Sequence, residues 1–259
     1  QGSTVVDDTK LYENEIVRIR DVYIKFYETL EAEDQIIQKM FGDDFTEKPF
    51  TTAQFCNLMG KRSKENSKYP EKSFIVAAYD YDVPVYISTI KDSSLALNLA
   101  VHRLRDKIYK LDFVKEIIEQ AAILYQSKKS GLLILGGGVP KNTAQQTGPL
   151  LDQILRRNDG GQDYIIQITD ARPDTGGLSG ATQQEGKSWG KVQDANRGMV
   201  TVYTDATIAF PILALYVLSN QKTRKPKRLY KELDKMYDNL KNDYINNPIN
   251  KAKKTKKKN

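Results

Sequence analysis

Three residue types that carry much of protein chemistry occur only once each in this chain of 259 residues: Cys56, His102 and Trp189. A single cysteine excludes an internal disulfide, and a lone thiol is typical of a buried side chain in a reducing compartment. A single histidine excludes a metal site built from several histidines, and also a histidine relay supplied by this chain alone. We therefore expect a cytoplasmic protein whose chemistry depends on other groups and involves no metal.

Long apolar runs are also missing. The longest, 208–218, is interrupted by Pro211 and is shorter than the ~20 residues that a membrane helix needs. No basic segment followed by an apolar one, the pattern of a secretory leader, occurs near the start. Residues 1–3 resemble the remnant of a protease-site linker, so we interpret 1–10 as a linker. A membrane partner is not expected.

The positive charge of the chain is concentrated at its end. Residues 221–259 carry 14 Lys and Arg against 4 Asp and Glu, a balance of +10, so the net charge of +7 leaves −3 for residues 1–220. We interpret 221–245 as a C-terminal helix and 246–259, which ends in KAKKTKKKN, as a solvated basic tail. Nucleic-acid binding is the less favoured interpretation, because the tail offers no aromatic residues for base stacking.

The spacing of apolar residues predicts an α/β fold. Helical periodicity occurs over 11–41, 74–81, 112–127, 143–157, 206–219 and 229–244, and 60–72 reads as a loop. Short apolar runs predict strands over 84–88, 131–135, 164–169 and 199–203. Strands separated by helix-length connections favour a Rossmann-like parallel sheet with helices on both faces.

Three loops follow the ends of predicted strands, where such sheets bind ligands. In GGGVPKN (136–142) the glycines fit either a loop that approaches a phosphate or a tight strand–helix turn. In TDAT (204–207), Asp205 fits either a contact to a ribose or amine or a cap for the helix that starts at Ala206, and the pattern favours the cap.

The third loop, 169–191, is too long for a connector in a compact domain unless it is functional or disordered. It ends in EGKSWGK, which holds the single Trp189. An indole face attracts cations, and Glu185 supplies an opposite charge. Lys191 would be desolvated in such a pocket, which suits Schiff-base chemistry. The alternative is that Lys191 is one surface lysine among many.

Several motifs taken together resemble the deoxyhypusine synthase family. GGGVPKN, SGA…E…SWGK and VYTDATIAFP occur in this order and spacing, after NEIVRIRDVYI and DSSLALNLAVH, and the resemblance covers 12–218. It implies an enzyme that oxidises spermidine or a related polyamine with NAD and passes the aminobutyl group through an imine on a lysine. The implied acceptor is a lysine of a translation initiation factor or, in relatives that make homospermidine, putrescine. The resemblance also implies a tetramer with sites at dimer interfaces.

Carried over residue by residue, the resemblance assigns the imine-forming amine to Lys191. The residues that it places along the polyamine are Glu185, Trp189, Gly137, Gly176, Gly177 and Asn142. The residues that it places at NAD are Asp92, Asp170, Ala171, Asp205 and Ala206.

The chain departs from the family pattern at several of these positions. Asn142 stands where a histidine is expected, Asp170 stands where other members carry threonine, and Leu97 and Leu178 stand where acidic residues are expected. The loss of two carboxylates weakens binding of a multiply charged polyamine unless other groups compensate. The departures therefore imply bacterial-type relatives with an altered polyamine or acceptor.

An amino-terminal region of the family, with a Ser/Asn-rich loop and a glycine-acidic cofactor motif, has no counterpart in the sequence. A sheet without its first strands exposes an edge. We therefore predict that 11–220 is the larger, C-terminal piece of a split or processed synthase, completed by a second chain. The alternative is a non-catalytic subunit that scaffolds or activates a related synthase.

Overall fold

The computed structural model describes residues 48–106, 108–157, 161–193, 198–220 and 224–247. The helix predicted over 11–41 lies outside these residues, as does the tail from residue 248 onward. The chain forms two compact units, which we describe separately: Gln1–Pro49 with Ile90–Lys110, and Phe50–Thr89 with Leu111–Asn259.

The described part of the first unit contains a short 3-10 turn, η2 (Ile90–Asp92), and the helix α6 (Ser94–Leu104). The Ser93 hydroxyl accepts from the backbone N–H of Ala96 at 3.4 Å and so caps α6. His102 is buried, and its ring meets Tyr109 edge-on at 5.4 Å. The single histidine therefore belongs to the packing of this unit.

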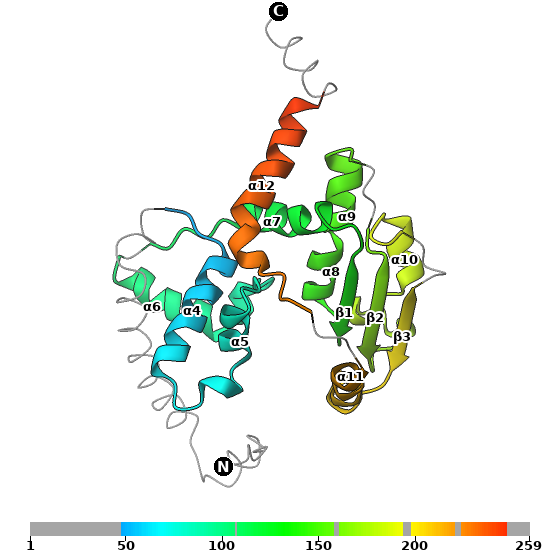
Figure 1. The fold of residues 1–259 in the computed structure, drawn as a ribbon, viewed down its shortest axis with the longest axis horizontal. Coiled ribbons are helices and arrows are strands. Elements are labelled where there is room, and N and C mark those ends of the chain that lie inside the picture. Colours follow the sequence, from blue (N-terminus) through cyan, green and yellow to red (C-terminus); the bar gives the residue numbers. More distant parts are fainter. Residues whose placement is uncertain (1–47, 107, 158–160, 194–197, 221–223, 248–259) are drawn as a thin grey trace, which may run out of the picture. The chain divides into compact units, whose positions relative to one another are not determined.

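Three parallel strands form a sheet in the second unit, in the order β1 (Gly131–Leu135), β2 (Tyr164–Thr169) and β3 (Met199–Tyr203) (Figure 1). Leu133 lies opposite Ile166, and Ile166 lies opposite Val200. These strands have the predicted bounds, and the α/β prediction is confirmed. Their carboxyl ends meet at one edge, so the three glycine- and polar-rich loops leave the sheet on the same side.

The connection from β1 to β2 is helical through α8 (Val139–Gln145), α9 (Thr147–Pro149) and a π-helical turn, η3 (Leu150–Ile154). The single helix predicted over 143–157 is thus wrong at both ends. The helix starts earlier because Pro140 suits a first helical turn. The regular pattern breaks after Pro149, and the N–H of Leu155 donates to the Leu150 carbonyl five residues back.

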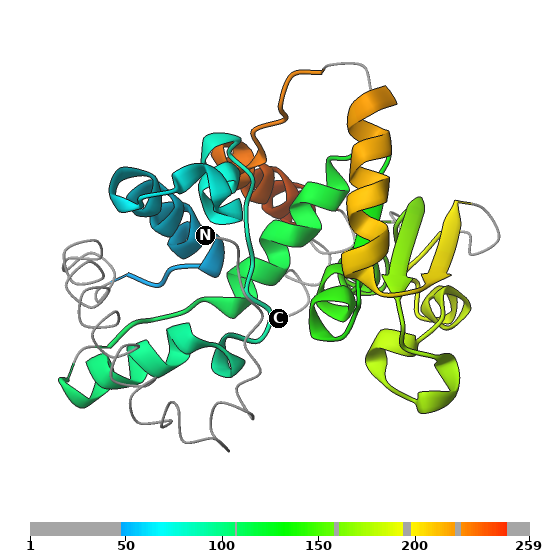
Figure 2. The same cartoon turned by 90° about the horizontal axis from the view of Figure 1, so that it is seen from below.

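The loop between β2 and β3 is ordered by two 3-10 turns, η4 (Pro173–Thr175) and η5 (Leu178–Gly180), and the short helix α10 (Gln183–Ser188). After β3 the chain enters α11 (Ala206–Asn220), which contacts β2 and runs beside the strands (Figure 2). The helix predicted over 206–219 is therefore confirmed.

The remaining helices of this unit are α4 (Thr52–Asn66), η1 (Pro70–Lys72), α5 (Phe74–Asp80), α7 (Phe113–Tyr125) and α12 (Leu229–Asn246). α7 and α12 pack together around a core of Ala121, Ala122, Leu151, Met236 and Leu240. Leu151 belongs to η3, so this core also holds the β1–β2 connection. The helices predicted over 74–81, 112–127 and 229–244 are confirmed.

Two predictions for this part of the chain are wrong. Residues 60–66 belong to α4 instead of a loop, and Gly60 lies directly against α5, since an added Cβ would lie 2.6 Å from the Ile75 carbonyl oxygen. Residues 84–88 form no strand. The N–H of Ile87 donates to the Thr52 hydroxyl at 3.0 Å, so a helix terminus takes the hydrogen bond that a neighbouring strand would otherwise accept.

The single cysteine is buried in α4, as predicted. Burial, reinforced by the charge of Glu116, raises the pKa of the Cys56 thiol to about 11. A thiol with this pKa is an inert packing group at neutral pH.

One face of the sheet carries apolar side chains that this unit leaves exposed. Leu133, Ile166 and Val200, which form one row across the three strands, are 45%, 37% and 48% exposed. α11 has no buried residue, and Ile212 and Leu215 are about two-thirds exposed. No helix among the described residues has both the length and the apolar character to cross a membrane.

Candidate functional site

Lys191 and three of the predicted polyamine residues, Asn142, Glu185 and Trp189, line one cavity between α8 and α10. The cavity has a volume of about 270 Å³, and its walls include Lys141, Asn142, Leu178, Glu185, Trp189 and Lys191. The first two residues come from α8, Glu185 comes from α10, and Trp189 and Lys191 follow α10 directly. Segments nearly fifty residues apart in the sequence thus face the same space.

Lys191 is held in this cavity by its backbone and its side chain. Its N–H donates to the Gly186 carbonyl at 2.9 Å, and its carbonyl accepts from Gln162 at 3.1 Å. The Lys191 amine donates to Asn142 Oδ1 at 2.6 Å and lies 6.0 Å from the centroid of the Trp189 ring. Burial lowers the pKa of Lys191 below the usual lysine range. A lysine with a lowered pKa is a better nucleophile near neutral pH.

Glu185 and Trp189 are set four residues apart by α10, so they lie on the same side of that short helix. Glu185 completes a capping box: its Oε1 accepts from the Thr182 backbone N–H at 3.3 Å and from the Thr182 hydroxyl at 3.0 Å. The Trp189 side chain is 65% exposed, and its carbonyl accepts from Gln153 Nε2 at 3.0 Å. The backbone around the indole is therefore fixed, while its ring is open to a ligand.

Lys141 is a wall residue that the sequence analysis missed. Its side chain is buried, and its amine donates to Gln167 Oε1 at 3.0 Å and to the Ala181 carbonyl at 2.6 Å. Burial lowers the pKa of Lys141; the charge of Glu185 opposes this, and the charge of Lys191 adds to it. The available signal was its place directly before Asn142 in GGGVPKN, but one lysine among many in a loop gives no sign of burial.

Three buried glutamines join α8, β2 and α10, and one of them, Gln145, also lines the cavity. Gln145 donates to Gln183 Oε1 at 3.0 Å, and Gln183 donates to Gln167 Oε1 at 3.2 Å. Gln167 donates to the carbonyls of Gly136 and Ser179 at 2.9 and 2.7 Å. This network satisfies the buried amides and fixes the walls of the cavity relative to the sheet.

The three glycines that the resemblance places along the polyamine do not line the cavity. An added Cβ on Gly137 would lie 2.8 Å from Ser179 Cα, so glycine permits the contact between the 136–138 loop and η5. Gly176 has φ +69° and ends η4, and Gly177 is exposed beside it. Leu178, which follows, does line the cavity and brings an apolar side chain where the family pattern has an acid.

The residues predicted at NAD lie mostly at the carboxyl ends of the strands. Asp170 and Ala171 follow β2, and Asp205 and Ala206 follow β3. Exposed carboxylates at this edge are suitable acceptors for ribose hydroxyls, so the residue types fit the cofactor. Asp92 belongs to the first compact unit, in η2.

Asp205 also caps α11, as the sequence pattern favoured. Its Oδ1 accepts from the Thr207 N–H at 2.7 Å and from the Thr207 hydroxyl at 2.6 Å. These hydrogen bonds lower the pKa of Asp205 and keep it ionised near neutral pH.

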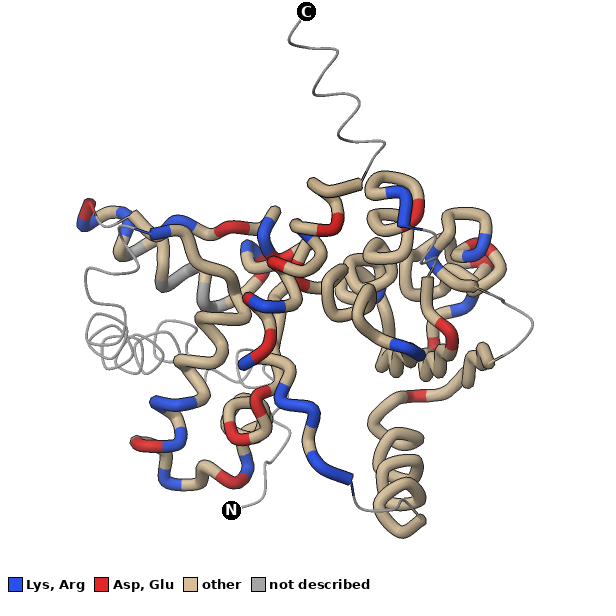
Figure 3. The backbone as a smooth tube through the Cα atoms, turned by 45° about the horizontal axis from the view of Figure 1, so that its top comes forward, with Lys and Arg blue, Asp and Glu red and all other residues tan. Residues whose placement is uncertain are grey.

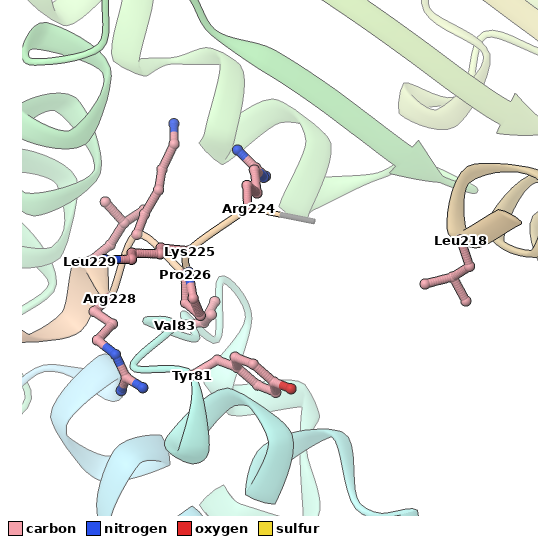
Figure 4. Close-up of a pocket in the computed structure, with 9 residues that line it drawn as sticks. Tyr81, Val83, Leu218, Arg224, Lys225, Pro226, Arg228 and Leu229 are labelled. Atoms are coloured by element: carbon pink, nitrogen blue, oxygen red, sulfur yellow. The ribbon is translucent and has the colours of Figure 1, made fainter. Parts of the chain in front are cut away.

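The segment that leads into α12 is rich in Lys and Arg (Figure 3). A second cavity, of about 540 Å³, lies beside this segment (Figure 4). Its walls include Tyr81, Leu218, Arg224 and Arg228. Arg228 donates to Asp82 Oδ2 at 2.5 Å, which ties the start of α12 to the end of α5. None of the predicted site residues lines this cavity, and we assign it no function.

Comparison with known proteins agrees with the motifs. The deoxyhypusine synthase family model matches residues 1–217. A "Deoxyhypusine synthase-like protein" of Nostoc sp. is 40% identical over 252 residues, which cover 94% of this chain and 66% of that protein. A "Probable deoxyhypusine synthase 2" of Methanosarcina acetivorans is 36% identical, with coverages of 88% and 64%. This chain therefore spans about two thirds of the length of these relatives.

Proposed function

The chain belongs to the deoxyhypusine synthase family, and we propose that it is an NAD-dependent aminobutyltransferase of the cytoplasm. Spermidine or a related polyamine is oxidised, and its aminobutyl group passes through an imine on Lys191 to an acceptor amine. The acceptor is a lysine of a translation initiation factor or putrescine. The observation that carries this proposal is the half-buried Lys191 amine, which Asn142 holds beside the indole of Trp189.

When bound, NAD takes up the hydride that converts an amine C–N bond of the polyamine into an imine, and returns it at the end. The Lys191 nitrogen attacks the imine carbon and forms a new C–N bond. The old C–N bond breaks, and the rest of the polyamine leaves as an amine that carries the two protons given up by the Lys191 nitrogen, which becomes the imine nitrogen. The aminobutyl group remains on Lys191 as an imine until the acceptor amine attacks the same carbon and releases the lysine.

The other walls of the cavity orient the polyamine in this proposal. The Glu185 carboxylate pairs with a terminal ammonium group, and the exposed indole of Trp189 packs along the methylene chain. Asn142 Oδ1 holds the Lys191 amine until the imine forms. Leu178 offers no charge, so the described wall pairs with fewer ammonium groups than the family pattern implies.

Borohydride trapping tests the covalent step. Protein incubated with spermidine, NAD and its assembled partners is reduced, digested and analysed by mass spectrometry. We expect an aminobutyl adduct on Lys191 and its complete loss in Lys191→Ala. Lys187→Ala, which removes an exposed lysine of α10, is the matched control and should leave the adduct yield unchanged. An assembled protein that forms no adduct would refute the proposal.

We also propose that a second polypeptide packs on the exposed row of Leu133, Ile166 and Val200 and on α11. The support is the apolar character of this surface, which the described residues leave uncovered. Native mass spectrometry of the purified complex should then reveal the second polypeptide in a tetramer-like assembly. Full adduct yield from copies of this chain alone would contradict the proposal.

The second candidate function is a non-catalytic subunit that scaffolds or activates a related synthase. Leu178 in the cavity wall favours it, because the polyamine loses a carboxylate there. Lys191→Ala separates the two functions: an activating subunit should still stimulate the related synthase, whereas a catalytic chain should lose turnover.

A further inference from the structure

The wall of the cavity described above is poor in carboxylates. Of the ten described residues that line it, Lys141, Lys191 and Glu185 have ionisable side chains. The indole of Trp189 also attracts cations, but it lies on the same side of α10 as Glu185 and already has the Lys191 amine 6.0 Å from its centroid. Glu185 and Trp189 therefore suit the same ammonium group of a ligand. The described wall offers a carboxylate to one ammonium group and none to a second.

Neutral acceptors in the wall already accept hydrogen bonds from protein groups. Asn142 Oδ1 accepts from the Lys191 amine at 2.6 Å, and the Ala181 carbonyl accepts from the Lys141 amine at 2.6 Å. A second ammonium group of a ligand would compete with these two protein amines for the same oxygens. An ammonium group that leaves water without a full set of acceptors binds weakly, because it loses its hydration.

Leu178 gives the wall an apolar side chain on a different element from Glu185. It begins η5, whereas Glu185 belongs to α10. The turn is held in place, because the Ser179 carbonyl accepts from Gln167 at 2.7 Å and an added Cβ on Gly137 would lie 2.8 Å from Ser179 Cα. Leu178 is therefore fixed at the cavity, and an apolar group of a ligand can bury surface against it.

The donor in the proposed reaction is a secondary amine with two arms. The aminobutyl arm ends in the ammonium group that pairs with Glu185, and the other arm leaves with the old nitrogen. We propose that Leu178 is a specificity-determining residue, which selects donors with an uncharged alkyl leaving arm over donors whose leaving arm ends in a second ammonium group. This inference rests on the proposed function of the cavity as the polyamine site, and it narrows the donor to N-alkylated diamines.

Two amines that differ only in the leaving arm test this selection. N-propylputrescine is spermidine without the terminal amino group of its aminopropyl arm. Trp189 is the single tryptophan of the chain and lines the cavity, so its fluorescence reports binding of either amine there. We expect the full chain to bind N-propylputrescine about tenfold more tightly than spermidine. Glu185→Gln should weaken both amines alike, because both keep the aminobutyl ammonium group.

Substitution of Leu178 should reverse the preference. Leu178→Glu supplies a second carboxylate, and we expect it to favour spermidine by about tenfold. Leu178→Gln has nearly the same shape without the charge and should not favour spermidine, which separates pairing of charges from a polar or loosened wall. Val139→Glu is the matched control, because Val139 is 40% exposed against 42% for Leu178 but does not line the cavity. It should keep the wild-type order.

Competition between the two donors measures the same preference in the reaction. Both donors leave the same aminobutyl group on Lys191, and the leaving amine is propylamine from one and diaminopropane from the other. Deuterium in the aminobutyl arm of one donor therefore distinguishes their adducts by mass. Assembled protein with NAD and equal amounts of both donors is reduced with borohydride, and we expect the adduct from N-propylputrescine to exceed that from spermidine about tenfold.

The proposal is overturned if the wild type binds spermidine as tightly as N-propylputrescine, or if Leu178→Gln favours spermidine as strongly as Leu178→Glu does. These results are distinct from failure of the proposed function. Absence of an adduct from either donor, with the expected order in the fluorescence titration, removes the aminobutyl transfer and keeps Leu178 as the residue that selects the amine. Equal adducts from both donors keep the aminobutyl transfer and remove the Leu178 assignment.

Discussion

The two faces of the three-stranded sheet differ in how completely this unit covers them. On one face, Ile134 and Ile165 are buried against Val192, and Gln167 is bound to α8, α10 and η5. On the other face, the row of Leu133, Ile166 and Val200 remains exposed. The cavity lies on the covered face, so contacts within this chain fix the positions of its walls. The open face is where we place the second polypeptide.

The largest expected effect is on the covered face, at Gly161. Gly161 has φ +71°, and an added Cβ would lie 2.5 Å from the backbone carbon of Lys191. Gly161→Ala should therefore lower the free energy of unfolding by about 3–5 kcal/mol and displace Lys191. Chemical denaturation measures the loss. Gly176→Ala, with φ +69° and open space around it, should cost only about 1–2 kcal/mol. Equal losses would argue against the close contact.

A smaller effect is expected at the centre of the glutamine network. Gln167→Leu removes an acceptor of Lys141 and leaves the carbonyls of Gly136 and Ser179 without this donor. We expect a loss of about 3 kcal/mol in the free energy of unfolding, since buried polar groups lose their partners. Gln184→Leu, at an exposed position of α10, should change it by less than about 0.5 kcal/mol. Similar values for both variants would mean that the network does not stabilise the covered face.

For the exposed apolar side chains of α11, the expected effect is on association and not on folding. Ile212→Ser with Leu215→Ser should change the free energy of unfolding of this chain by less than about 1 kcal/mol, because both side chains are exposed. The same pair should weaken binding of the second polypeptide at least about tenfold, measured by titration calorimetry. Lys235→Ser, on the exposed side of α12, is the surface control. Unchanged affinity in the α11 variant would move the interface elsewhere.

The smallest effect is a pH dependence confined to the covered face. Burial lowers the pKa of Lys141 in the folded protein, whereas an unfolded lysine titrates at about 10.4. Between these values the unfolded state binds more protons, so stability rises with pH. The free energy of unfolding of the wild type should therefore increase relative to that of Lys141→Met between pH 7 and pH 10. The Ile212→Ser and Leu215→Ser variant should follow the wild type across that range.

The sequence predicted the elements whose apolar pattern is local. The three strands, α7, α11 and α12 follow from runs and periods that each segment carries by itself. Predictions failed where a distant contact decides the structure. Gly60 was predicted to lie in a loop, because the local sequence does not show that α5 packs too closely there for any side chain. The 84–88 segment looked like a strand, but the Thr52 side chain accepts its hydrogen bond.

For the site, the motifs alone placed Glu185, Trp189 and Lys191 in one loop, and the topology of a parallel sheet predicted that the GGGVPKN loop leaves the same edge. The contact of Asn142 with Lys191, the burial of Lys141 and the glutamine network needed the tertiary structure. The physical reason is that motif spacing and strand order are properties of the chain, whereas burial, and with it the pKa of an amine, depends on segments that only folding brings together.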